Sequence, residues 1–243
     1  MRAVLGELIG WFGDPAHWTG PTGVPQRLLE HLGYTALALA CALVIALPIG
    51  ALVGHTGRGG FLLVGLANGL RALPTLGLLT VVVLLAGVGL LPPIAALTVL
   101  AVPPVLAGTY AGVRAVDPAV VDAARGMGMR EHQVLLRVEL PNALPIIFGG
   151  VRSAALQIVA TATVAAYVAM GGLGRYVIDG LAQLDYPQVL AGAVLVAALA
   201  VVLDAAFAGV QRVVSPAGAR RSRRGRAGRV SAVRATEPGG TPG

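Results

Sequence analysis

The sequence predicts an all-helical integral membrane protein that crosses the bilayer about five times. Apolar residues make up 56% of its 243 residues, whereas charged residues make up only 12%. Several apolar runs reach the roughly 20 residues that a helix needs to cross the hydrocarbon core of a bilayer. Because spans and short connections account for most of the chain, we expect one membrane domain and no soluble domain with a core of its own.

Five apolar runs are expected to form the spans. They cover residues 34–54, 61–90, 93–113, 143–169 and 188–214. The second run is the longest, and because Arg71 and Pro74 interrupt it, we expect one tilted or kinked helix there. Together the runs define a transmembrane domain over residues 34–214.

Residues 1–33 precede the first span and are expected to form an external or interfacial segment. One interpretation is a short amphipathic helix that lies on the membrane, followed by a Gly/Pro-rich loop; the alternative is simple disorder. In the helical interpretation, four apolar residues share one side: Leu5, Leu8, Ile9 and Phe12. Trp11 and Trp18 fit anchoring in the membrane interface, where the amphipathic indole ring is favoured.

Arginine supplies all 18 basic residues, and its distribution predicts the orientation of the chain. In a five-span protein, Arg58, the arginines between the third and fourth spans, and those after residue 215 fall on one side. Short connections rich in arginine are typical of the cytoplasmic side, so we expect an external N-terminus and a cytoplasmic C-terminus. Residues 215–243 are expected to form a disordered Arg-rich tail, which either anchors this orientation or also binds anionic lipid.

Several kinds of chemistry find no support in the sequence. The absence of lysine excludes an ATP site built on a P-loop, so another chain would have to bind any nucleotide. Neither a serine-hydrolase elbow nor an HExxH pair occurs, and the four histidines are too scattered to suggest a metal cluster. Cys41 has no partner for a disulfide. We therefore expect no catalytic residue, no bound cofactor and no metal site in this chain.

A polar, charged stretch between the third and fourth spans stands out from its apolar surroundings. Asp117 is well placed to cap a helix whose first turn contains Pro118, and the helix is expected to end near Gly126 and Gly128. A second amphipathic segment follows and is expected to stop near Pro141. From the residues alone, this helix–turn–helix is either a docking element for a soluble partner or an amphipathic loop that lies on the membrane.

The spacing of residues in this stretch resembles the EAA loop of ABC importer permeases. That loop has the pattern E-A-A, three residues, G, nine residues, then I-x-L-P. Here the corresponding residues are Asp122, Ala123, Ala124, Gly128, Val138, Leu140 and Pro141. Every spacing is kept, and Asp for Glu and Val for Ile are the only departures.

The resemblance implies a type I ABC importer permease fold in which residues 114–141 form a cytoplasmic coupling loop. Such a loop docks in a cleft of an ATPase subunit and passes the motion of that subunit to the spans. Ala123 and Ala124 would allow close helix approach, Gly128 would make the turn, and Asp122 would supply a cap or an ion pair. The residues assigned to ATPase coupling are therefore Asp122, Ala123, Ala124, Gly126, Gly128, Leu140 and Pro141.

Further segments resemble one subfamily of these permeases, which imports osmoprotectants such as glycine betaine, carnitine, choline and proline betaine. They are LRALPTLGLL, VPPVLAGTYAGV, VDPAVVDAARGMGM and TATVAAYVAMGGLG. The resemblance implies a multi-pass protein of a bacterial cell membrane that is itself no enzyme, with ATP bound by partner subunits. Expected partners are cytoplasmic ATPase subunits, a second permease, identical or related, an extracellular substrate-binding protein and membrane lipid, but no nucleic acid.

Two alternatives to osmoprotectant import stay open on this evidence. The same loop would serve a permease for another small solute, for example an amino acid or a phosphonate. A membrane anchor that holds an ATPase without transporting a solute would also contain such a loop. Aromatic residues make up only 5% of the chain, and no aromatic cage for a quaternary ammonium group is apparent in the spans. Substrate selection is therefore expected to lie with the separate binding protein.

Three charged residues within the spans are candidates for an intramembrane ion pair. Arg71 and Arg152 could each extend toward the membrane surface, whereas Asp204 is harder to place against lipid. We expect Asp204 to pair with one of the two arginines inside the bundle.

The sequence GGLG follows the fourth span and includes Gly171, Gly172 and Gly174. These glycines either end the helix or act as a hinge near an external gate.

Overall fold

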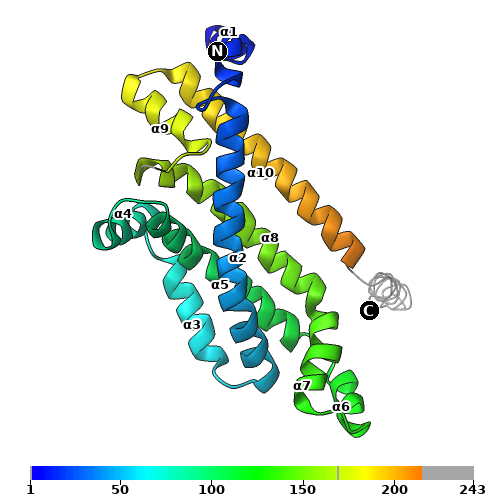
Figure 1. Ribbon diagram of the computed structural model, residues 1–243. Coiled ribbons are helices and arrows are strands. Elements are labelled where there is room, and N and C mark those ends of the chain that lie inside the picture. The colour runs from blue at the N-terminus through cyan, green and yellow to red at the C-terminus, as the bar shows by residue number, and fades with distance from the viewer. Residues whose placement is uncertain (1, 169, 215–243) are drawn as a thin grey trace, which may run out of the picture.

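The computed structural model describes residues 2–168 and 170–214 of the chain, so the tail expected over residues 215–243 lies outside the described residues. Within them the protein is built from helices and connecting turns, which confirms the predicted all-helical class (Figure 1). In chain order the elements are α1 (Arg2–Gly13), η1 (Pro15–Trp18), α2 (Val24–Thr56), α3 (Gly60–Arg71), α4 (Thr75–Ala86), α5 (Leu91–Arg114), α6 (Pro118–Gly126), α7 (Glu131–Val134), η2 (Leu135–Glu139), α8 (Leu140–Ala165), η3 (Ala166–Val168), α9 (Gly174–Gln183) and α10 (Tyr186–Val214).

Among the described residues, four stretches of helix are long and apolar enough to cross a membrane: α2, α5, the continuous stretch Glu131–Val168, and α10. The pair α3 and α4 supplies a fifth candidate span, but its two helices meet at 89°. The expectation of one tilted or kinked helix over residues 61–90 is therefore wrong. Pro74 disfavours helical geometry at the preceding residue and has no N–H to donate, so the helix stops at Arg71 and a new one starts at Thr75.

The first long helix begins earlier than the apolar pattern indicates. α2 starts at Val24 instead of residue 34, with Pro25 in its first turn. The predicted N-terminal segment over residues 1–33 therefore contains the first turns of α2. His31 lies in this extension and is fully buried, with its Nε2 atom 3.1 Å from the carbonyl oxygen of Val159 on α8. Tertiary packing thus holds polar residues within a helix that hydropathy alone would begin later.

α5 lies at the centre of the bundle and packs against both α2 and α8. Small residues allow this close approach: on α2, Ala38, Ala42 and Ala46 are fully buried. Where α5 crosses α8, a Cβ atom added to Gly150 would lie 2.7 Å from the carbonyl oxygen of Pro104. Helices in membranes commonly associate through small residues at their crossings, because close van der Waals packing replaces the hydrophobic effect, which is weak between helices surrounded by lipid.

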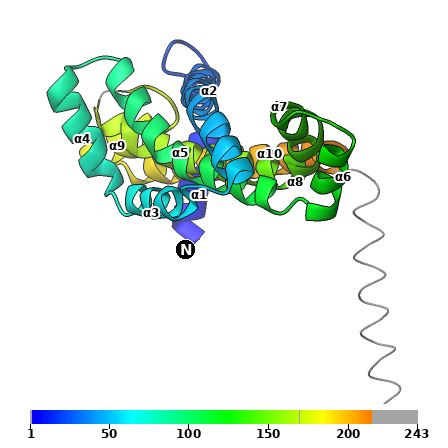
Figure 2. The same ribbon diagram turned by 90° about the horizontal axis from the view of Figure 1, so that it is seen from below.

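The ends of the bundle carry different elements. α1 and α9 lie at one end and α6 and α7 at the other, hereafter the α9 end and the α6 end (Figure 1). Seen along the bundle, α3 and α4 lie on the side opposite α6 and α7 (Figure 2). α10 packs against both α8 and α9, so the last span joins the α9 end to the core.

The N-terminal helix packs onto the α9 end of the bundle. Trp11 is only 6% exposed, stacks on His17 at a centroid distance of 4.1 Å, and meets Tyr176 edge to face. Ile9, in contrast, is 72% exposed. Leu8 and Phe12 of the expected apolar side pack in the same cluster as Trp11, which is a packed residue instead of an interfacial anchor. Packing against α10, together with the contact to Tyr176 of α9, decides which side of α1 is buried, and both partners are distant in sequence.

Candidate functional site

α6 lies at the tip of the bundle (Figure 1), and all of its residues except Val121 and Ala124 are exposed. The helix begins at Pro118, and the Asp117 carboxylate accepts a hydrogen bond of 2.9 Å from the Ala119 N–H, as predicted for a helix cap. Gly126 is the last helical residue, whereas Gly128 has a φ of +81° and makes the turn. The local sequence signals therefore place this helix and its turn correctly.

The two alanines of the loop motif differ in exposure. Ala124 is 2% exposed and packs, with Val121, against Val134 of α7, so it stabilises the loop itself. Ala123 lies on the outward side. Ala124 therefore has a packing role within the loop, while the close approach of a partner helix to Ala123 and Ala124 stays a prediction.

The outward face of α6 consists of Val120, Ala123 and the adjoining C-cap residue Met127, which follow one another at spacings of three and four residues. Val120 is 46% exposed and Met127 is 78% exposed. Asp122 lies beside this face, with 75% of its side chain exposed. An apolar face on a short helix outside the span region is typical of a docking surface.

The segment after Gly128 does not stop near Pro141, contrary to expectation. α7, the π-helical turn η2 and α8 follow one another without a break over Glu131–Val168. The π turn widens the helix immediately before Pro141, which accommodates a residue with no N–H, and the Asn142 amide donates 2.7 Å to the Val138 carbonyl oxygen. Leu140 and Pro141 are therefore the first residues of α8, and the loop is joined rigidly to the fourth span.

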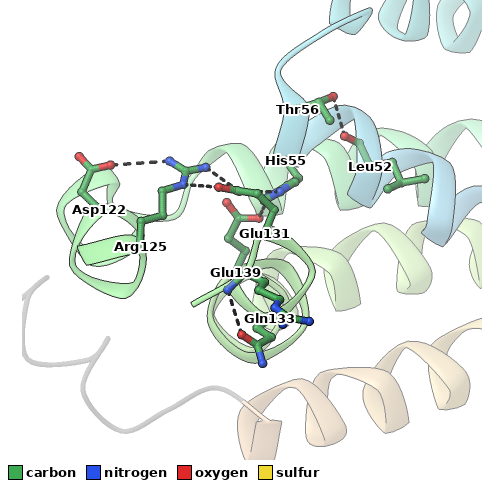
Figure 3. A network of polar contacts seen from close by, with 9 residues as sticks. Leu52, His55, Thr56, Asp122, Arg125, Glu131, Gln133 and Glu139 are labelled. Carbon is green, nitrogen blue, oxygen red and sulfur yellow. Dashed lines mark hydrogen bonds and ion pairs between the residues drawn. The ribbon is translucent and has the colours of Figure 1, made fainter. Parts of the chain in front are cut away.

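A network of charged side chains joins the 114–141 segment to the last turn of α2 (Figure 3). Arg125 donates to Glu131 at 3.0 Å and lies 3.7 Å from Asp122. His55 of α2 contacts two carboxylates, with Nε2 3.1 Å from Glu131 and Nδ1 2.6 Å from Glu139. The hydrogen bond from Arg125 to Glu131 raises the pKa of the Arg125 guanidinium above its ordinary value.

Two of the three charged residues expected to interact within the spans are in contact. Arg152 of α8 donates two hydrogen bonds of 2.6 Å to the two carboxylate oxygens of Asp204 on α10. This bidentate geometry is the strongest arrangement of such a pair. Arg71 takes no part: it is exposed at the end of α3, where α3 and α4 diverge.

The turn with Gly171, Gly172 and Gly174 packs tightly at the α9 end. Gly172 has a φ of +83°, and its N–H donates 2.8 Å to the Glu30 carboxylate on α2. A Cβ atom on Gly171 would collide with the same carboxylate, and one on Gly174 would collide with the Thr163 carbonyl oxygen. Close approach therefore accounts for Gly171 and Gly174 and the left-handed backbone for Gly172, while a hinge role stays a prediction.

A shallow hollow of about 270 Å³ with polar side chains lies between α4 and α8. Thr75, Gln157 and Thr161 supply its polar groups. Gln157 donates its amide N–H at 2.9 Å to the Leu100 carbonyl oxygen, which holds the side chain in one orientation. Uncharged polar groups are thus available within the span region.

Sequence reasoning missed several of these residues. Val120 and Met127 share the outward face with Ala123, a signal that helical spacing alone contains. Glu139 lies four residues after Leu135, so an acidic residue on the apolar side of the second segment was a further signal. Its partner His55 could not be found this way, because the two residues are 84 positions apart.

Three relatives with curated names are similar to the chain along most of its length. The carnitine transport permease protein OpuCB of Listeria monocytogenes is 34% identical over 81% of this chain and 90% of its own length. The choline transport system permease protein OpuBB of Bacillus subtilis is 34% identical, over 80% of this chain and 90% of its own. The osmoprotectant import permease protein OsmW of Salmonella typhimurium is 33% identical over 79% of this chain and 91% of its own length.

Solved structures share the fold. An inward-facing structure of the MetNI methionine ABC transporter matches with a TM-score of 0.72 and 22% identity, over 84% of this chain and 100% of the matched chain. A crystal structure of an amino acid ABC transporter with histidines matches with a TM-score of 0.60 and 22% identity, over 77% and 90%. These likenesses confirm the predicted type I ABC importer permease fold.

A family model covers the greater part of the chain, including the 114–141 segment, the α8 and α10 spans and the last turns of α2. The match extends over residues 46–217 and describes a binding-protein-dependent transport system inner membrane component. With the apolar helices and the shared permease fold, this match establishes a membrane location. The chain therefore belongs to the family of binding-protein-dependent transport system inner membrane components.

Proposed function

We propose that the chain is the permease subunit of an ATP-driven importer of osmoprotectants, with glycine betaine, carnitine, choline and proline betaine as the substrate class. Relatives named for the transport of carnitine, choline and glycine betaine are 33–34% identical to it over most of both chains, which supports this class. The likeness to a methionine transporter, at 22% identity, concerns the fold alone.

The proposed subunit works within a larger assembly. Two cytoplasmic ATPase subunits, a second permease that is identical or related, an extracellular substrate-binding protein and surrounding lipid complete it. The α6 end faces the cytoplasm, in accordance with the arginine distribution, and the α9 end faces outward. ATP binding and hydrolysis on the partner subunits shift the permease pair between outward-open and inward-open states.

The outward face of α6 is the observation that carries this proposal. Val120 and Met127 expose apolar side chains at the tip of the bundle, and Ala123 between them leaves room for a partner to approach. Burying a methionine side chain stabilises an interface by about 1.5–3 kcal/mol, so Met127 is well suited to anchor the helix in a cleft. Asp122 at the edge of the face, already paired with Arg125, fixes the orientation of docking.

The hollow between α4 and α8 is the proposed lining of the solute route. Thr75, Gln157 and Thr161 offer uncharged polar groups there, and the aromatic rings that contact one another in the described residues lie at the α9 end instead. A route without an aromatic cage binds a quaternary ammonium solute weakly. Weak binding suits a pathway that has to release its cargo.

The proposal is tested by uptake of labelled glycine betaine, choline and carnitine in cells that express the complete transporter. Wild type is compared with Ala123→Trp, which places a bulky side chain on the docking face, and with His132→Trp at an exposed position of α7 as the control. We expect uptake by wild type and by the control, and loss of both uptake and ATPase copurification in Ala123→Trp at equal membrane abundance.

Other outcomes would point to the alternative functions. Failure of wild type to take up any osmoprotectant would refute the substrate class, and amino acids and phosphonates would then be assayed. ATP hydrolysis that no solute stimulates and no uptake accompanies would support an anchor without transport activity.

A further inference from the structure

We propose that His55 and Glu139 form a joint that makes the end of α2 follow the movements of the 114–141 loop. The inference rests on the proposed function, because it assigns a path to the motion that ATPase subunits impose on α6. The loop is linked covalently to α5 and α8, whereas α2 meets it only through noncovalent contacts. His55 is therefore a positioning residue for coupling, and it contacts no solute.

The contacts of His55 are specific for the loop. The side chain of His55 is 10% exposed and that of Glu139 is 6% exposed. A carboxylate buried to this extent is strongly unfavourable without a partner, and His55 Nδ1 at 2.6 Å is that partner. The other ring nitrogen, Nε2, lies 3.1 Å from Glu131, so one imidazole holds both α7 and the π turn to α2 (Figure 3).

Packing around this contact is incomplete, which gives the joint its mechanical importance. An apolar hollow of about 670 Å³ separates Leu47 and Leu52 of α2 from Leu136 and Leu140. A second hollow of about 180 Å³, lined in part by His55 and Glu139, lies between the loop and the ends of α2 and α5. Beside these hollows, the imidazole contacts supply a direct polar link between α2 and the loop.

The joint also continues to the docking face. Asp122, beside that face, lies 3.7 Å from Arg125, Arg125 donates to Glu131 at 3.0 Å, and Glu131 contacts His55. Coupling between distant sites is carried by such contiguous networks when they connect rigid elements. A displacement of α6 therefore acts on α2 through side-chain contacts as well as on α5 and α8 through the backbone.

The first test replaces both partners at once. His55→Leu alone leaves Glu139 buried without a partner, so low membrane abundance is expected and the single variant is not decisive. The double variant His55→Leu/Glu139→Leu substitutes apolar residues of similar size, and replacements of this kind are often neutral for stability. Thr56→Ala is the control, because Thr56 is exposed and its hydroxyl bonds only to nearby backbone groups, the Leu52 carbonyl oxygen and the Arg58 N–H.

For the double variant we expect membrane abundance and ATPase binding close to wild type. Solute uptake per ATP hydrolysed should fall about 5-fold or more, because about 5-fold is the lower end of the coupling factors usually found between two sites. The control should match wild type in all three. If His55 and Glu139 served stability alone, the double variant would recover uptake together with abundance. That recovery would overturn the proposal.

A second measurement does not depend on the identity of the solute. Spin labels at Arg58→Cys and His132→Cys, in a Cys41→Ser background free of other cysteines, report the distance between the end of α2 and α7. In the wild-type joint this distance should stay the same when the complete transporter is trapped with ATP and vanadate, because the two elements move together. In His55→Leu/Glu139→Leu it should shift or broaden on trapping.

The two readouts separate this inference from the proposed function. A label distance that shifts equally in the wild-type and variant joints would refute the joint, whatever solute is transported. A label distance that behaves as expected, in a transporter that imports no osmoprotectant, would retain the joint and refute the substrate class.

Discussion

Gly128 offers the sharpest test of the turn between α6 and α7. Its φ of +81° lies in the left-handed region, and a Cβ atom there would have no other atom within 4 Å. Substitution therefore strains the backbone without causing a steric clash. Gly126, two residues earlier, is helical, so the coupling role expected for it does not require a glycine backbone, and its equally open surroundings make it a matched control for backbone strain.

The size of the effect follows from the backbone conformation. A non-glycine residue in the left-handed region costs about 1–2 kcal/mol, and β-branched residues cost more, whereas Asn tolerates it. A difference of this size changes an equilibrium between the native turn and other conformations by a factor of about 5–30. Gly126→Ala, in contrast, should stabilise α6 by about 0.5–1 kcal/mol, because alanine favours the helix.

If only the native turn docks, apparent affinity for the ATPase falls with the fraction of permease in that conformation. We expect both ATPase binding and uptake to decrease in the order wild type, Gly128→Asn, Gly128→Ala, Gly128→Val, with at most about a 5–30-fold loss for Gly128→Ala. Gly126→Ala should equal wild type. The assay titrates purified permease with ATPase subunits and measures uptake at equal membrane abundance.

Either of two results would refute this reasoning. Gly126→Ala could lower ATPase binding as much as Gly128→Ala, which would mean that side-chain volume matters at the docking surface and backbone strain does not. Gly128→Val could also bind and transport like wild type, which would mean that the left-handed turn is dispensable for docking.

Three further predictions concern the spans and the α9 end. Asp204→Ala should lower membrane abundance or transport because it leaves Arg152 without its bidentate partner, and the exchanged pair Arg152→Asp/Asp204→Arg should recover part of the loss. Retained transport at an unchanged protein level in Asp204→Ala would contradict a role for this ion pair. Gly150→Val should nearly abolish membrane abundance of the protein, because a Cβ atom at Gly150 would lie 2.7 Å from a carbonyl oxygen of α5. Gly149→Ala should be tolerated, since its Cβ would lie 3.9 Å from the nearest neighbour, and equal abundance of the two variants would argue against close α5–α8 packing. Tyr176→Phe removes a 2.7 Å hydrogen bond to the Thr22 carbonyl oxygen and should lower the unfolding free energy by about 0.5–1.5 kcal/mol. The assay is the melting temperature in detergent, and an unchanged temperature would show that the bond does not contribute to stability.

The features that the sequence predicted correctly depend on neighbouring residues. Asp117 caps α6 through the Ala119 N–H and Gly128 makes the turn, since caps and left-handed glycines need only a few residues of context. The same holds for the number of apolar runs. Near Pro74, where one kinked helix was expected, the structure has a break between two helices. Its angle of 89°, however, depends on how α3 and α4 pack against α5 and α8, which no local pattern contains.

Contacts between distant residues were predicted incompletely. Asp204 was expected to find an arginine, but Arg71 and Arg152 were equally available in sequence, and the register between α8 and α10 selects Arg152. The pairing of His55 with Glu139 had no sequence signal, because 84 residues separate them and the π turn orients Glu139.

By itself, the sequence determined the all-helical membrane class, the approximate spans and the helix–turn–helix with its motif, because hydropathy, caps and turn residues act over a few positions. Tertiary structure alone decided which sides of those helices are buried. It placed Ala124 inside the loop and Ala123 outside, sharply bent the second span, ran the loop directly into α8, and brought His55 between two carboxylates. These outcomes depend on which helices meet, and that is set by packing among segments far apart in the chain.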